Sequence, residues 1–151
     1  RHTRYWRDWS SDVCSSDLET TRKTLRRVIE AGVEAEEGYT TTAKRIREAT
    51  DGEIGKRRAI RIARTEVHGA VERGNIEAIR ATGYGFDKQW VATEDMRTRP
   101  SHSAADGQRV PMDGRFTVGG VLMDFPGDQT APAREVINCR CVVLNMPRIP
   151  T

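Results

Sequence analysis

The chain is poor in aromatic residues, in cysteine and in long apolar runs. Aromatic side chains make up 6% of its 151 residues, which argues against a large aromatic-lined ligand pocket. No apolar run approaches the roughly 20 residues that span a bilayer, so we predict no membrane partner. Two of its three cysteines, Cys139 and Cys141, are separated by a single residue. This spacing does not form a disulfide framework, so it indicates a reducing, intracellular context.

Charged residues account for 31% of the chain and hydrophobic residues for 36%, with a formal net charge of +3. This composition is typical of a polar globular protein, and the length is sufficient for one domain with a modest core. The small positive charge is compatible with nucleic acid as a partner but does not require it.

The first eighteen residues show neither a helical nor a strand period. The run from Arg7 to Leu18 resembles a translated sequencing adaptor, so we predict that residues 1–18 are a non-native, disordered segment and exclude them from the fold. We therefore expect the natural protein to continue upstream, with the present chain as its C-terminal part.

Residues 19–54 are predicted to form a helical lead-in. A first helix over residues 19–37 follows from apolar residues at helical spacing. These residues are Leu25, Val28, Ile29 and Val33. A short second helix follows Thr40–Thr42, which supply candidate N-caps, and ends near Asp51-Gly52.

The strongest helical pattern covers residues 55–81 and opens a domain that we predict over residues 55–147. An alanine-rich apolar stripe runs along this helix, and the pattern places Glu72 and Arg73 on its outer face. Gly74 lies inside the pattern and is a candidate break, because glycine costs about 1 kcal/mol relative to alanine in a helix.

After the glycines at 83 and 85 the pattern changes to short strands and turns, ending in a tail at residues 148–151. Gly119-Gly120 is typical of a hairpin turn. Strands are predicted over residues 88–93, 115–118, 121–125 and 141–144, and single helical turns near residues 101–105 and 131–136. We predict an α+β fold in which N-terminal helices pack on a small, mainly antiparallel sheet with long loops.

The candidate site lies in two polar segments, Asp95–Gly107 and Ile137–Cys141, with further residues on the long helix. Closely spaced polar residues in loops indicate a functional site more strongly than apolar residues in a helix, which usually serve packing. The residues are Arg64, Glu66, Asp95, Arg97, Arg99, His102, Asp106, Asn138, Cys139, Arg140 and Cys141. Our first interpretation is structural: Arg99 and Arg140 tie loops to carboxylates or carbonyls, and no residue is assigned a catalytic role.

A metal site is the second interpretation. His102, Asp106, Cys139 and Cys141 offer one nitrogen, one oxygen and two sulfurs to a zinc ion. An extended backbone places both cysteines on the same side. Against this, the Cys-x-Cys spacing lacks the two-residue gap of zinc knuckles, and both thiols would also serve as small buried hydrophobes.

Enzymatic interpretations remain open alongside these. A cysteine nucleophile would use His102 as its base, and Asp95, Asp106 and His102 have the chemistry for acid–base work. The sequence contains neither a glycine–lysine phosphate loop nor a dinucleotide fingerprint. Arg64 and Glu66 either point toward the polar loop or belong to a solvated helix face.

Five short segments follow one another in an order that resembles a known family. They are Arg61–Glu66, Lys88–Trp90, the loop Asp95–Gly107, Phe125–Asp128 and Glu135–Cys141. Together they resemble the phage Mu F-like head morphogenesis family, the minor capsid proteins of tailed phages and prophages, over about residues 40–146.

This resemblance implies a virion protein that acts in head assembly near the portal, in the host cytoplasm during assembly. Portal and capsid proteins are the partners it implies, with phage DNA as a further candidate. It also implies a fold remotely similar to ADP-ribosyltransferases. Some relatives are fused to toxin domains, and nothing in this chain indicates one.

Two alternatives to the assembly role follow from the same residues. A metal-dependent or ADP-ribosyltransferase-like enzyme would have a cleft on which Arg64, Asp95 and His102 converge. A DNA-contacting module of the portal region would bind in a salt-dependent way. Its arginines would be Arg57, Arg58, Arg61 and Arg73.

Overall fold

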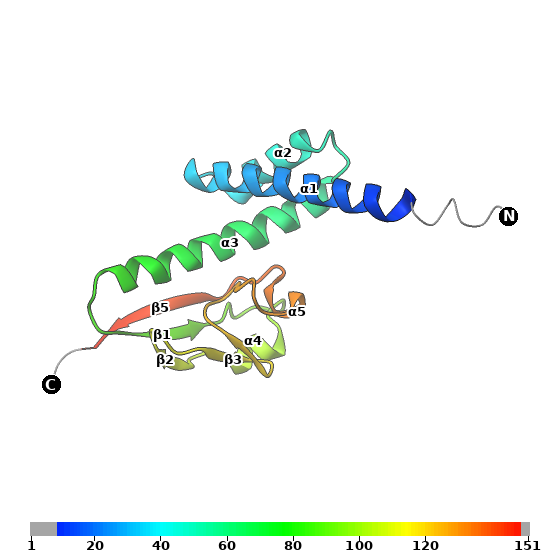
Figure 1. Ribbon diagram of the computed structural model, residues 1–151. Helices are drawn as coiled ribbons and strands as arrows, with labels where there is room; N and C mark the ends of the chain where they lie inside the picture. The colour runs from blue at the N-terminus through cyan, green and yellow to red at the C-terminus, as the bar shows by residue number, and fades with distance from the viewer. Residues whose placement is uncertain (1–8, 149–151) are drawn as a thin grey trace. The chain divides into compact units, whose positions relative to one another are not determined.

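The computed structural model describes residues 9–148, with side chains described from residue 19 onward. The chain divides into two compact units that meet within one long helix, at Ala63 and Arg64 (Figure 1). We call residues up to Ala63 the helical unit and residues from Arg64 the sheet unit.

The helical unit consists of α1 (Trp9–Glu34), α2 (Tyr39–Ala49) and the first residues of α3 (Lys56–Ala81). Its buried core is aliphatic, and α1 lines it with partly buried side chains. The fully buried members are Ala43, Ile46, Ile54, Ala59 and Ala63, and the α1 members are Leu25, Val28 and Ile29. The apolar residues whose spacing predicted these helices therefore contribute to this core.

Helix α1 begins at Trp9, ten residues before the start predicted from the sequence, and it ends at Glu34 rather than residue 37. Extending a helix adds a backbone hydrogen bond for each residue fixed, at far lower cost than nucleating one. A helix can therefore continue past its amphipathic part. The prediction of disorder for residues 1–8 lies outside the described residues. At the other end the left-handed backbone of Glu36, with φ 53°, follows the helix.

The sheet unit contains a three-stranded antiparallel sheet of order β2-β1-β5 and a separate β3-β4 hairpin. Strand β1 (Phe86–Val91) is central, with β2 (Arg109–Pro111) on one side and β5 (Val142–Pro147) on the other. The predicted α+β class with a small antiparallel sheet is confirmed. β1 starts two residues earlier than predicted, and β5 extends three residues further.

The hairpin joins β3 (Phe116–Val118) to β4 (Val121–Met123) through the predicted turn at Gly119-Gly120. Both glycines have positive φ, 56° and 77°, as a type I′ turn requires. The short helices α4 (Pro100–Ala104) and α5 (Ala133–Val136) occupy the two predicted helical turns.

The core of the sheet unit is built around Trp90, which is fully buried and packs edge-to-face on Phe116 at 5.4 Å between ring centroids. The second half of α3 runs along the three-stranded sheet (Figure 1) and contributes the buried Ile76. Trp90 therefore joins the sheet, the hairpin and the helix in one core.

The face that α3 presents within the sheet unit differs from the apolar stripe predicted for it. Glu72, placed on the outer face by the pattern, is 5% exposed, whereas Val71 is 56% exposed. The Glu72 carboxylate accepts a hydrogen bond of 3.1 Å from the backbone N–H of Val143 in β5. That bond compensates for burial, so a charged residue takes a core position. α3 runs unbroken through Gly74, which the sequence marked as a candidate break.

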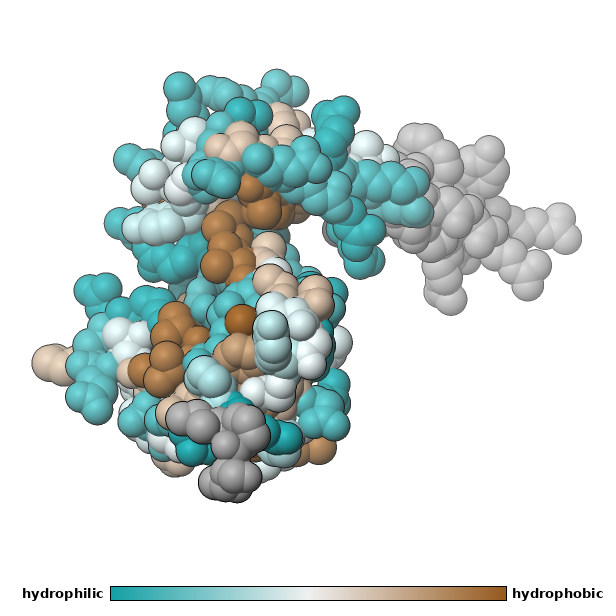
Figure 2. All heavy atoms as spheres, turned by 90° about the vertical axis from the view of Figure 1, so that its left-hand side faces the viewer, coloured by the Kyte–Doolittle hydropathy of each residue, from teal (hydrophilic) through white to brown (hydrophobic). Residues whose placement is uncertain are grey.

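Most of the surface shown in Figure 2 is hydrophilic, with hydrophobic side chains in separate patches. Across residues 9–148, none of the helices combines the length and the apolar character that crossing a bilayer would need.

Candidate functional site

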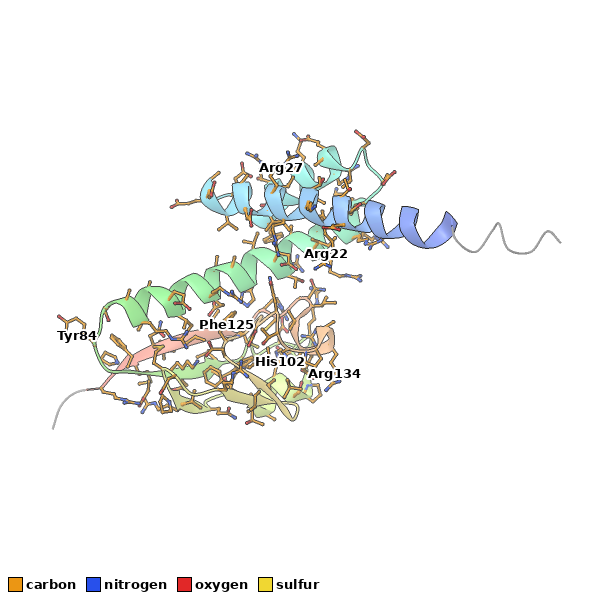
Figure 3. All side chains as sticks on the ribbon, viewed as in Figure 1. Arg22, Arg27, Tyr84, His102, Phe125 and Arg134 are labelled. Atoms are coloured by element: carbon orange, nitrogen blue, oxygen red, sulfur yellow. The ribbon has the colours of Figure 1, made fainter. Side chains whose placement is uncertain are left out.

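His102 is positioned by the short helix α4. Arg99 precedes this helix in an extended conformation, φ −67° and ψ 145°, and Pro100 begins it, as expected for the residue before a proline. The imidazole is 1% exposed, and its ring stands edge-on to Trp90 with centroids 5.5 Å apart. Figure 3 places His102 inside the sheet unit, whereas Tyr84 projects outward.

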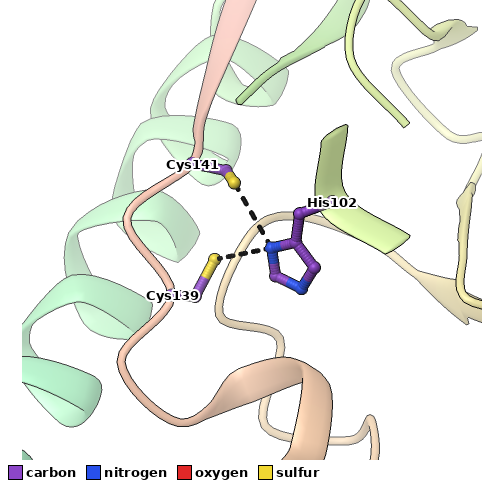
Figure 4. Close-up of side chains that lie close together, drawn as sticks. All are labelled: His102, Cys139 and Cys141. Carbon is purple, nitrogen blue, oxygen red and sulfur yellow. Dashed lines mark hydrogen bonds between the residues drawn. The ribbon is translucent and has the colours of Figure 1, made fainter. Parts of the chain in front are cut away.

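Cys139 and Cys141 lie between α5 and β5, and both are buried, at 1% and 2% exposure. The left-handed backbone of Asn138, φ 56°, turns the chain just before them. The two sulfurs approach the same ring nitrogen of His102 (Figure 4), with Nδ1–Sγ distances of 3.7 Å to Cys139 and 3.3 Å to Cys141. The structure therefore brings both cysteines to His102.

Glu135, which sequence reasoning did not select, faces the other side of the imidazole. Its Oε2 lies 3.2 Å from His102 Nε2, although the ring nitrogen is not aligned for a hydrogen bond. Ser101 Oγ donates to the same oxygen at 2.9 Å. In the sequence, Glu135 was indicated only by the segment Glu135–Cys141 that carries the family resemblance, because no spacing relates it to His102.

The electrostatics of the cluster separate the two thiols. A hydrogen bond from the Cys139 thiol, helped by His102, holds the pKa of Cys141 well below its usual range despite burial. The same shared hydrogen bond and burial raise the pKa of Cys139. Burial raises the pKa of Glu135, but the Ser101 hydrogen bond and His102 outweigh it, and the net shift is downward.

Asp106, the fourth predicted metal ligand, is not part of this cluster; the grouped side chains are His102, Cys139 and Cys141. Its Oδ1 instead accepts a 2.7 Å hydrogen bond from the backbone N–H of Ala92. Helix α4 ends at Ala104, so Asp106 lies beyond it and does not share a helical face with His102, four residues earlier.

Asp95 and Arg140 form a bidentate pair on the surface. Arg140 Nη1 and Nη2 donate to the two Asp95 oxygens at 2.5 and 2.6 Å. The backbone N–H of Arg97 also donates to Asp95 Oδ1 at 2.9 Å, while the Arg97 side chain is exposed. The guanidinium holds the pKa of Asp95 well below its usual range. These contacts fix the start of the polar loop against the cysteine segment.

Two further contacts attach the cysteine segment to its surroundings. The Arg99 guanidinium donates to the backbone carbonyl of Ile137. The backbone N–H of Asn138 donates to Thr65 Oγ1 of α3 at 3.1 Å. The loop and α3 therefore both bind the backbone immediately before Cys139.

Arg64 and Glu66 occupy the part of α3 that begins the sheet unit. Arg64 is half-buried. Glu66 accepts a hydrogen bond from Gln129 Nε2 in the loop after β4, and burial raises the pKa of its carboxyl. Glu66 is therefore engaged with a loop rather than belonging to a fully solvated face.

An open hollow of about 540 Å³ lies beside the polar loop. Its lining residues are Ala92, Glu94, Asp95, Met96, Ser103 and Asp106. Of the three residues expected to converge on a cleft, Asp95 lines this hollow and His102 and Arg64 do not. The buried cluster and the hollow are thus separate features.

A buried ion pair between Lys88 and Asp124 was also missed. Lys88 is fully buried; its Nζ donates to the Asp124 backbone carbonyl at 2.7 Å and to the Asp124 carboxylate. Burial lowers the pKa of Lys88, and the contact with Asp124 opposes this. The sequence did contain a sign of this burial. Alternate residues of a strand share a face, so Lys88 lies on the same face as the buried Trp90 and Ala92.

The sequence matches the family described as Phage Mu protein F like protein over residues 23–144, a range that contains every residue of the site. The chain belongs to this family. The resemblance drawn from its short segments is confirmed, and the match begins earlier than the segments indicated.

Two curated relatives match most of the chain. The chain is 32% identical to the minor head protein GP7 of Bacillus phage SPP1 over 119 residues, 77% of this chain and 38% of that protein. It is 33% identical to the NAD(+)–arginine ADP-ribosyltransferase EFV of Enterococcus faecalis over 111 residues, 72% of this chain and 22% of that protein. The chain therefore spans well under half the length of either relative. No solved structure matches.

Proposed function

We propose that this chain is the Mu F-like part of a minor head protein of a tailed phage or prophage. The observation that carries the proposal is the 32% identity to the minor head protein GP7 across 77% of the chain. In this proposal the protein is a virion component, acts in capsid assembly in the host cytoplasm, and contacts the portal and capsid proteins.

The contacts of the polar residues support an assembly role for the sheet unit. Asp95 pairs with Arg140, and Arg99 binds the carbonyl of Ile137. These side chains bind one another and the backbone, and they hold two loops in place. A rigid loop surface of this kind is suited to docking on another protein.

A chimeric phage tests the proposal directly. The matched segment of GP7 in phage SPP1 is replaced by residues 23–144 of this chain, and heads are purified and examined for the chimeric protein and for plaque titre. We expect the chimera to enter the heads and to restore a titre lost when the segment is deleted.

The matched control is the same chimera carrying Trp90→Ala, which removes the central core side chain of the sheet unit. We expect it to be absent from heads. Exclusion of the unmutated chimera from heads, with the protein folded and expressed at the level of GP7, would contradict the assembly role.

The 33% identity to the enterococcal ADP-ribosyltransferase raises a second candidate function. We propose instead that the shared segment is a module common to both proteins and that transfer chemistry lies in the remainder of that enzyme. The purified chain, given NAD and an arginine acceptor, is then expected to transfer no ADP-ribose. Transfer that is lost in a variant of the sheet unit would favour the enzyme.

DNA contact is a third candidate, carried by the exposed Arg57 and Arg58 in the first turn of α3. Arg73, grouped with them by sequence, instead lies over the Phe125 ring at 5.7 Å. Phosphate contacts would make duplex DNA binding weaken steeply with salt, and Arg57→Ala would reduce that slope by about one. Binding that is insensitive to salt would exclude this mode.

A further inference from the structure

The buried cluster of His102, Cys139 and Cys141 brings one imidazole nitrogen and two sulfurs together in the sheet unit. Their potential ligand atoms all lie within 4.8 Å of one another. We propose that His102 Nδ1, Cys139 Sγ and Cys141 Sγ bind one zinc ion, with a water molecule in the fourth position. This proposal does not depend on the assembly role.

The two nitrogen–sulfur distances are close to those of a tetrahedral zinc site. Zinc binds thiolate sulfur at about 2.3 Å and imidazole nitrogen at about 2.0–2.1 Å, so tetrahedral angles place nitrogen and sulfur about 3.5 Å apart. The observed Nδ1–Sγ distances are 3.3 Å for Cys141 and 3.7 Å for Cys139. An ion between the three atoms therefore needs only small adjustments of the side chains.

Without an ion, hydrogen bonds join these groups in a chain, in which the Cys139 thiol donates to Cys141 and His102 Nδ1 bonds to one sulfur. Nδ1 carries either one lone pair or one proton, yet both sulfurs approach that same atom (Figure 4). A single hydrogen bond serves one of the two sulfurs. A cation at the centre bonds to all three atoms at once.

The groups around His102 are those usually found around a histidine that binds a metal ion. When Nδ1 binds a metal, the neutral ring carries its proton on Nε2, and that proton usually faces a carboxylate or carbonyl. Glu135 Oε2 lies 3.2 Å from Nε2, and Ser101 Oγ holds the same oxygen at 2.9 Å. Glu135 is thus near enough to accept this proton after a small rotation of the ring, since Nε2 is not yet aligned with it.

The choice of zinc follows from the ligand types, since two thiolates and an imidazole suit zinc better than magnesium or calcium. The three residues are 1–2% exposed and none of them lines the open hollow, so the ion would be enclosed within the sheet unit. The ion would connect α4 to the segment before β5, across 37 and 39 residues of sequence.

The test uses the full 151-residue chain, purified under reducing conditions without chelator. Zinc content is measured by elemental analysis, and X-ray absorption of the unmutated protein counts its sulfur and nitrogen or oxygen neighbours. Zinc is then replaced by cobalt, whose thiolate charge-transfer and tetrahedral d–d bands report the ligands. We expect one zinc per chain, bound by two sulfurs and two lighter atoms.

Matched variants assign the ligands. Cys139→Ser, Cys141→Ser and His102→Ala are expected to lose the zinc and the tetrahedral cobalt spectrum. Asp106→Ala, which alters an acid outside the cluster, is expected to retain both. Glu135→Gln should keep the ligand set but bind zinc about 10–100-fold more weakly, as changes to ligand-orienting residues do.

The unmutated protein keeps the test decisive if a ligand variant fails to fold. Folded protein that contains no zinc, takes up no cobalt and gives the same melting temperature with and without chelator would overturn the proposal. Zinc that persists in all three ligand variants, or that has no sulfur neighbours, would also overturn it.

Discussion

The helical unit buries small aliphatic side chains, whereas the sheet unit buries charged and polar groups beside its aromatic ones. The core of the first contains Ala43, Ile46 and Ala59. The second encloses polar side chains that each have a specific partner or neighbour. They are Glu72, Lys88, His102, Asp128 and Glu135.

This difference determines what holds each unit together. Aliphatic cores gain stability roughly in proportion to buried apolar area and tolerate substitutions that conserve volume. Buried charges are stable only with their partners, so the loss of one partner is far more costly than the net contribution of the pair. We therefore expect the sheet unit to be sensitive to isosteric polar changes that the helical unit would tolerate.

The largest expected effect is the removal of Trp90. Trp90→Ala should lower the free energy of unfolding of the sheet unit by about 3–5 kcal/mol, the usual range for a buried aromatic residue. Ile46→Ala should cost the helical unit about 2–5 kcal/mol. Hydrogen exchange resolved by residue measures each unit separately. Leu122→Ala, at a position 55% exposed, is the control and should change little.

The next largest effect is expected from removing Asp124, the partner of the buried Lys88 in the sheet unit. Asp124→Ala leaves Lys88 buried without its carboxylate and should destabilise the sheet unit by about 3 kcal/mol. Glu48→Gln, which disrupts the exposed Lys44–Glu48 pair of α2 at 3.8 Å, should cost less than about 0.5 kcal/mol. Urea unfolding measures both. Equal losses of stability in the two variants would contradict the expectation that the sheet unit depends more on its polar partners than the helical unit does.

A double variant checks the cause of the Asp124 effect. Replacing Lys88 by Met and Asp124 by Leu together should recover much of the lost stability, because paired apolar groups avoid burying an unmatched charge. If the double variant is no more stable than Asp124→Ala, then packing rather than charge explains the loss.

Two glycines of α3 should respond in opposite directions. A Cβ at Gly69 would lie 2.9 Å from the backbone oxygen of Gly127, whereas one at Gly74 would meet nothing within 4 Å. Gly69→Ala should therefore destabilise the protein by about 1–3 kcal/mol. Gly74→Ala should stabilise it by about 0.5–1 kcal/mol. Thermal unfolding compares the two, and a gain at Gly69 would contradict the close helix–loop approach.

The smallest expected effect is the pH dependence of the exposed Asp95–Arg140 pair. Its guanidinium partner lowers the pKa of Asp95 in the folded state, so the contribution of the pair is complete above the unfolded pKa of about 3.9 and declines as pH falls toward the folded value. The urea midpoint of the wild type should exceed that of Asp95→Asn near neutral pH, and the difference should shrink in acid and at high salt. A difference that is constant with pH would contradict the ion pair.

Local patterns in the sequence were sufficient to predict most of the helical residues and several turns, but not the start of α1 at Trp9. Apolar spacing located α2 and most of α3, Pro100 marked the start of α4, and Gly119-Gly120 marked the hairpin. These features depend on residues a few positions apart, whose geometry the backbone itself fixes. The Cys-x-Cys alternation likewise predicted that Cys139 and Cys141 lie on one side.

Tertiary structure decided which residues meet across the chain. It buried Glu72 against β5, directed Asp106 to the backbone of Ala92 rather than to His102, and brought Glu135 to the far side of the imidazole. Sequence spacing cannot specify such contacts, because they depend on where two distant segments cross. The sequence by itself determined the helices, the turns and the family, whereas the folded chain selected the partners of each buried polar group, since a buried charge is stable only where a partner reaches it.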